Sequence, residues 1–83
     1  MADVVSLTHA EWLDLWEIRV HQKLTIQLNL EHMDTALVAA ERFTGDSAEN
    51  LLIQARKAGA NRVVLTKYHE DGWVDVEAFC VEE

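Results

Sequence analysis

Residues 62–81 decide the fold, and they read RVVLTKYHEDGWVDVEAFCV. The stretches Arg62–Tyr68 and Trp73–Val81 are rich in β-branched and aromatic residues, which predicts two strands. Between them, Asp71-Gly72 is typical of a tight turn. We therefore expect an antiparallel hairpin at the carboxyl-terminal end of the sequence.

The alternation of side chains divides this hairpin into two faces. One face is expected to pack against helices and holds Val63, Leu65, Val74, Val76, Ala78 and Cys80. The other face mixes large apolar groups with carboxylates and holds Val64, Tyr68, Trp73, Asp75, Glu77, Phe79 and Val81. A two-residue turn would place Lys67 opposite Val76, and a four-residue turn over 69–72 would shift the partners while keeping the same faces.

Two helices are expected outside the hairpin. Thr8 and Glu11 form a Thr-x-x-Glu capping box, which predicts a helix that begins at about His9 and ends near Trp16. A second helix is predicted over Ser47–Ala58, where Asp46 and Glu49 resemble a capping box and Gly59 suits the left-handed position after a helix.

The even positions from Ile18 to Leu30 are apolar except for Gln22, which predicts a half-buried strand that is best supported over Lys23–Glu31. Residues 35–43 are ambiguous, because their alanines would also suit a helix with Asp34 as N-cap. We expect a second strand there, antiparallel to the first, because a strand must pair to be stable. A short initial strand at Val4–Leu7 is a further possibility.

These elements predict a single acidic α+β domain over residues 1–83. The expected order is α-β-β-α-β-β, which makes a two-layer sandwich. In it, a mostly antiparallel sheet of about four strands carries two helices on one face.

Charge and cysteine content narrow the function classes. The chain has 15 acidic and 7 basic residues and a net charge of −8, which disfavours direct binding to nucleic-acid phosphates or anionic membranes. Cys80 is the only cysteine, and residues 1–5 lack the features of a signal peptide. We expect a cytoplasmic protein with no membrane association.

No arrangement of residues in the sequence predicts catalysis. In the expected hairpin Cys80 and His69 lie roughly 20 Å apart along the strands, which excludes a thiol–imidazole pair. The four histidines lack metal-ligand spacing, and no glycine-rich phosphate loop is present. We expect a protein that is not an enzyme and has no catalytic residue, metal or cofactor.

The acidic face of the hairpin is the strongest functional feature. Residues 69–83 contain no lysine or arginine and six carboxylates, namely Glu70, Asp71, Asp75, Glu77, Glu82 and Glu83. A solvated edge that keeps the protein soluble would explain them, and Trp73 and Phe79 would then pack on each other or under a loop. The functional interpretation is a partner-binding surface formed by Tyr68, Glu70, Asp71, Trp73, Asp75, Glu77 and Phe79.

Such a surface fits a basic protein or nucleoprotein partner, on which the carboxylates would act as a nucleic-acid mimic. In size, acidity and element order the chain resembles small phage-encoded inhibitors, including anti-CRISPR proteins. The resemblance is one of general type over the whole chain and involves no shared motif. It implies an inhibitor or modulator that binds another protein. The main alternative is a small assembly protein that forms a homodimer through its sheet edge or its aromatic face. A small enzyme with a pocket at a subunit interface is a third hypothesis.

Overall fold

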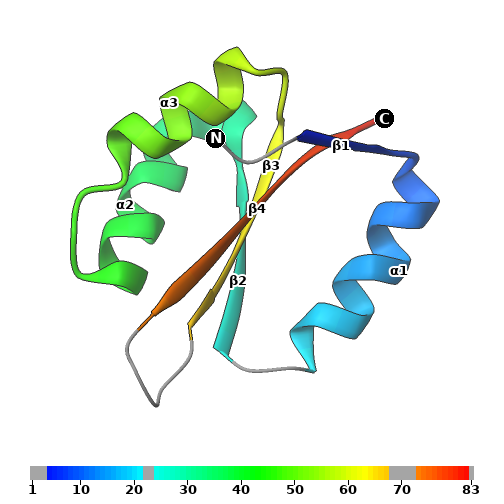
Figure 1. The fold of residues 1–83 in the computed structure, drawn as a ribbon, viewed down its shortest axis with the longest axis horizontal. Coiled ribbons are helices and arrows are strands. Elements are labelled where there is room, and N and C mark those ends of the chain that lie inside the picture. The colour runs from blue at the N-terminus through cyan, green and yellow to red at the C-terminus, as the bar shows by residue number, and fades with distance from the viewer. Residues whose placement is uncertain (1–3, 22–23, 68–72, 83) are drawn as a thin grey trace.

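The computed structural model describes residues 4–21, 24–67 and 73–82. Its elements follow in chain order as β1 (Val4–Leu7), α1 (His9–Val20), β2 (Leu24–Asn29), the 3-10 turn η1 (Leu30–His32), α2 (Met33–Thr44), α3 (Glu49–Lys57), β3 (Arg62–Lys67) and β4 (Val74–Val81). The described strands form one mixed sheet in the order β1-β4-β3-β2 (Figure 1). The α+β class and a sheet of four strands are therefore confirmed, and the initial strand at Val4–Leu7 is present.

The β3–β4 hairpin is confirmed, and its register is the one expected from a four-residue turn, whereas the register of a two-residue turn is wrong. Lys67 lies opposite Val74 and Leu65 opposite Val76, two positions away from the partners that a two-residue turn would give. The shift is an even number of residues, so each side chain stays on its expected face. The predicted turn at Asp71-Gly72 lies outside the described residues.

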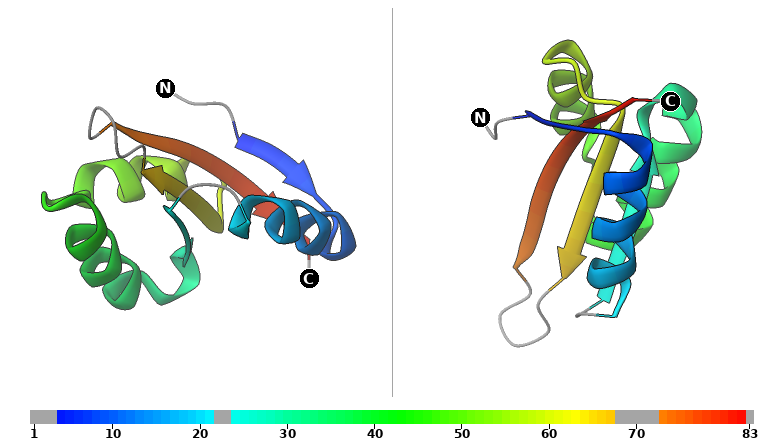
Figure 2. Two further views of the ribbon diagram at one scale, coloured as in Figure 1. Left: turned by 90° about the horizontal axis from the view of Figure 1, so that it is seen from below. Right: turned by 90° about the vertical axis from the view of Figure 1, so that its right-hand side faces the viewer.

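Helices cover both faces of the sheet. Figure 1 shows α2 and α3 on one side and α1 on the other, and both views of Figure 2 agree. The main core lies under α2 and α3 and includes Val63, Leu65 and Ala78 from the hairpin. A smaller core lies under α1, where Trp12 packs with Val64, Phe79 and Val81. The expected element order and helix count differ from this arrangement, because the described residues form three α-helices and α1 packs on the opposite face from the other two.

The first helix begins where the capping box predicts. The Glu11 amide donates to Thr8 Oγ1 at 3.2 Å, and the Thr8 amide donates to Glu11 Oε1 at 2.9 Å. The expected end near Trp16 is wrong, since α1 continues to Val20. Ile18 and Val20 are 60% and 46% exposed on this helix, so their apolar alternation does not reflect a buried strand face. The strand that follows, β2, occupies Leu24–Asn29, within the range predicted most firmly for it.

The strand expected over residues 35–43 is wrong, because this segment belongs to α2. Ala36 and Ala40 lie one helical turn apart and are buried in the main core, where their small side chains allow the helix to approach the sheet closely. The helix ends at Gly45, whose φ of 82° is the left-handed conformation that glycine adopts without strain. The helix predicted over Ser47–Ala58 is present as α3, with Gly59 in the expected left-handed conformation. Its predicted start is wrong, because α3 begins at Glu49 with Ala48 as N-cap, and no side chain of the expected Asp46–Glu49 pair caps it.

Candidate functional site

Trp73 is the exposed aromatic residue of the predicted binding face. It directly precedes β4, and 60% of its surface is accessible to solvent. The predicted site residues Tyr68, Glu70 and Asp71 lie outside the described residues. Trp73, Asp75, Glu77 and Phe79 are therefore the site residues whose positions the structure gives.

Phe79 does not belong to a binding surface, which corrects the expectation from the sequence. It is 5% exposed and its ring lies 5.5 Å from that of Trp12, which in turn stacks on Trp16 at 6.4 Å. Phe79 lies on the predicted face of the sheet, together with Val64 and Val81, but α1 covers this part of the face. The spacing of Trp12 and Trp16 was the signal for this contact, because two tryptophans one turn apart need an apolar surface to pack on.

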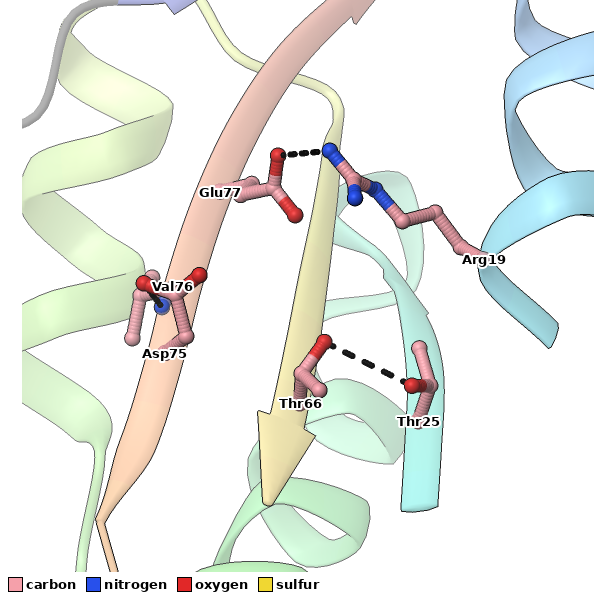
Figure 3. Close-up of polar contacts among 6 residues, drawn as sticks. All are labelled: Arg19, Thr25, Thr66, Asp75, Val76 and Glu77. Atoms are coloured by element: carbon pink, nitrogen blue, oxygen red, sulfur yellow. Dashed lines mark hydrogen bonds and ion pairs between the residues drawn. The ribbon is translucent and has the colours of Figure 1, made fainter. Parts of the chain in front are cut away.

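Glu77 is also held within the fold. An Nη2 atom of Arg19 lies 2.9 Å from Glu77 Oε2, and the two side chains are 30% and 27% exposed. Figure 3 shows the guanidinium extending from α1 over β3 to reach this carboxylate on β4. Glu77 therefore does not project freely into solvent, as it would on the solvated edge or the partner-binding surface expected from the sequence. Its charge is balanced inside the chain.

Asp75 lies beside the polar part of the same face. The Val76 amide donates to Asp75 Oδ1 at 3.1 Å, and the residue is half-buried (Figure 3). Its cross-strand neighbour Thr66 is buried and forms a 3.4 Å hydroxyl contact with Thr25 of β2. Exposed Trp73 and half-buried Asp75 therefore remain as the accessible part of the predicted site, and the part nearer α1 is structural.

A groove on the opposite side of the sheet was not predicted from the sequence. It is open, has a volume of about 700 Å³, and runs between β2 and α2. Its lining is mostly apolar, with a charged residue of each sign, and consists of Ile26, Asp34, Thr35, Val38, Ala39, Arg42 and Phe43. The assignment of residues 35–43 as a strand concealed the signal, which is the four-residue spacing of Asp34, Val38 and Arg42.

One wall of this groove is fixed by Lys67. Its Nζ donates to the Phe43 carbonyl at 3.3 Å and lies 6.0 Å from the centroid of the Phe43 ring. A hydrogen bond and a cation–π contact therefore act on the same residue of α2. They hold the phenyl ring in place between the helix and the sheet.

The described residues contain no group of three or more His, Cys, Asp or Glu side chains arranged to hold a metal ion. Cys80 is a free, half-buried thiol. Within the described ranges, no helix has the length and hydrophobicity to cross a membrane. No family model, curated protein or solved structure matches this chain.

Proposed function

We propose that this chain is a small acidic binding protein that inhibits or modulates a basic partner. It contacts that partner through Trp73 and Asp75 at the start of β4. The observation that carries the proposal is the exposure of Trp73, a large aromatic side chain left 60% accessible beside a carboxylate. Exposed tryptophans of this kind are enriched among the residues that dominate protein–protein binding energy.

Charge indicates the class of partner. The chain carries a net charge of −8, and the sequence from 69 to 83 has no lysine or arginine. Such an anionic segment accelerates association with a cationic surface and repels nucleic acid and anionic lipid. A basic protein, or a nucleoprotein with an exposed basic site, is therefore the partner that the charge favours.

Trp73 and Asp75 have different roles in this proposal. Trp73 supplies apolar contact area, while Asp75 pairs with an arginine or lysine of the partner. Glu77 contributes little to binding, because Arg19 already neutralises it. Where the partner binds nucleic acid, the carboxylates occupy its phosphate sites, so that the protein and the nucleic acid compete.

A pull-down from host lysate tests the proposal. Wild-type protein is compared with the Trp73→Ala/Asp75→Lys variant, and the captured proteins are identified by mass spectrometry at low and high salt. We expect a basic protein that wild type captures, that the variant fails to capture, and that high salt releases. Addition of nucleic acid is expected to displace it where that partner is a nucleic-acid-binding protein.

Glu49→Lys is the matched control, because it makes the same charge change at an exposed position on α3. If this control abolishes capture as completely as the double variant, net charge alone explains the binding. Capture that survives the Trp73→Ala/Asp75→Lys change would exclude this face as the binding surface.

A further inference from the structure

We propose that β2 and α2 form a symmetric interface through which two copies of this chain associate. The two β2 strands would pair antiparallel at their open edges, and the two α2 helices would pack side by side on the same face. This proposal concerns the sheet face that carries α2, which is opposite the face that carries Asp75, and it does not depend on the proposed function.

The open edge of β2 has hydrogen-bonding capacity at its centre. In the described sheet, β2 is an edge strand. The Leu30 amide donates to the Asn61 carbonyl at 3.0 Å, and in the same register Leu28 lies opposite Val63. Because hydrogen-bonded pairs alternate along an antiparallel ladder, the amide and carbonyl of Gln27 point away from β3. Gln27 is exposed, so neither neighbouring helix covers this point of the edge.

A two-fold axis at Gln27 would give both the outward amide and the outward carbonyl of this residue a hydrogen-bond partner. The amide of each Gln27 would donate to the carbonyl of the other, which makes one closely spaced pair of hydrogen bonds. The same axis places Ile26 of one copy opposite Leu28 of the other on the face covered by α2. The strand pairing would thus continue the sheet from one copy into the next and remove two exposed edges, which are otherwise sites of nonspecific pairing.

The groove beside this edge supplies apolar area to the same interface. Val38 is 54% exposed on α2, and Leu24 is 49% exposed at the start of β2 on the sheet face that carries Ile26. These side chains adjoin or line the groove of about 700 Å³ between helix and strand. A second α2 placed along the first would cover Val38 and close the groove from outside.

The charges on one α2 helix are complementary to those on a second, antiparallel α2 helix. Asp34 and Arg42 are exposed and lie four residues before and four residues after Val38, about 12 Å apart along the helix. When two such helices pack antiparallel about an axis near Val38, Asp34 of each copy lies beside Arg42 of the other. Two equivalent ion pairs then flank a central apolar contact, as an isologous interface requires.

This pattern is why we assign the groove to a second copy. Two chains of net charge −8 repel each other, so self-association requires a face whose charges are balanced. The exposed stripe Asp34-Val38-Arg42 carries one charge of each sign. An unrelated basic segment would be attracted by Asp34 and repelled by Arg42, whereas a second copy satisfies both.

Sedimentation velocity over a concentration series tests the proposal with three variants of the full chain. Asp34→Arg places two arginines together at each end of the interface, and Arg42→Asp places two aspartates together. Each is expected to raise the dimer dissociation constant roughly tenfold or more. The Asp34→Arg/Arg42→Asp double variant restores opposite charges and is expected to return the constant to within about threefold of wild type.

The strand half of the interface has its own test. Gln27→Pro removes the amide that points outward and leaves the β2–β3 hydrogen bonds in place, so it is expected to abolish the dimer without unfolding the monomer. Gln27→Thr is the matched control, because it changes the side chain and keeps the amide. Circular dichroism and thermal melts verify that each variant is folded.

Two results would overturn the proposal. The first is a wild-type chain that stays monomeric over the whole concentration series. An extended segment of another protein would then be the remaining candidate to bind in the groove. The second is a dimer that both single charge reversals leave intact, which would place the interface elsewhere. Neither result bears on the binding of a basic partner at Trp73.

Discussion

Arg19 and Glu77 join the first helix to the last strand through a 2.9 Å charged hydrogen bond between residues that are 58 positions apart in the sequence. The guanidinium passes over β3, so the pair fixes α1 against the sheet at the end of the helix farther from its capping box (Figure 3). The packing of Trp12 on Phe79 fixes the other end. The orientation of α1 is therefore set by apolar packing near its start and by a charged contact near its end.

Removal of the Arg19–Glu77 pair is expected to lower stability modestly. For Arg19→Met and Glu77→Gln, a double-mutant cycle from urea unfolding should give a coupling of about 1 kcal/mol, because both side chains are only partly shielded from water. Arg56→Met, at an exposed position on α3, serves as the control and should have little effect. Strictly additive single mutants would show that the contact contributes nothing to the fold.

Truncation of Phe79, within β4, should destabilise the fold much more than truncation of Trp73, which directly precedes β4. Phe79→Ala is expected to cost about 3–5 kcal/mol, because it leaves a cavity beneath Trp12. Trp73→Ala should change the free energy of unfolding by only about 0.5 kcal/mol, since the side chain is largely exposed. Urea unfolding followed by circular dichroism measures both. A larger loss for Trp73 than for Phe79 would contradict the assignment of the two residues.

The capping box should make stability depend on acid pH. Hydrogen bonds from the Thr8 amide and then from the Thr8 side chain lower the pKa of Glu11, and the slight burial of the carboxyl opposes this. The unfolded chain therefore binds a proton more readily than the folded chain, and stability rises with pH through this range. The contribution of Glu11 is complete above the ordinary glutamate pKa of about 4.3 and is lost as pH falls through the lowered pKa.

Glu11→Gln tests this dependence, because glutamine can accept the same hydrogen bond but does not ionise. Wild type should melt at a higher temperature than the variant near neutral pH, and the difference should vanish in acid. Glu17→Gln, on the exposed side of the same helix, is the comparison. A melting difference for Glu11→Gln that stays constant with pH would argue against the ionised capping box.

The Asn61 side chain should stabilise the end of the sheet at which β4 finishes. Its side-chain oxygen accepts from the Val81 amide and its side-chain nitrogen donates to the Val81 carbonyl, both at 2.8 Å. Asn61→Ala removes two hydrogen bonds and leaves both backbone groups of Val81 without them, so we expect a loss of about 2 kcal/mol. Asn50→Ala on α3 is the control and should not reduce stability. Equal effects of the two substitutions in thermal melts would contradict this role.

Local signals predicted the hairpin and α3, because each has a clear periodicity and α3 is followed by Gly59 in the left-handed conformation. The segment 35–43 lacked such a signal. Its run of alanine, leucine and valine fits either a strand or a helix, and only the burial of Ala36 and Ala40 one turn apart distinguishes the two. The end of α1 was misplaced because Ile18 and Val20 continue by coincidence the alternation of β2.

The sequence predicted which face of the sheet each described site residue occupies, but it did not predict which of these residues are exposed to solvent. Alternation determines which side of β4 carries Phe79 and Glu77, but it does not determine what covers that side. The position of α1 depends on β1 pairing beside β4, a contact between distant parts of the chain. Trp73 stays exposed because it lies before the strand, away from the tryptophans of α1.

The pairing of β1 with β4 also sets the order in which the fold can be completed. Val4 lies beside Ala78, and the Glu82 amide donates to the Leu7 carbonyl, so β1 has as its neighbour the strand farthest from it along the described residues. The β3–β4 hairpin closes a short loop, whereas β1 must close a loop that spans most of the chain, at a greater cost in entropy. During synthesis β1 and the apolar side of α1 therefore remain without β4 until that strand has been made.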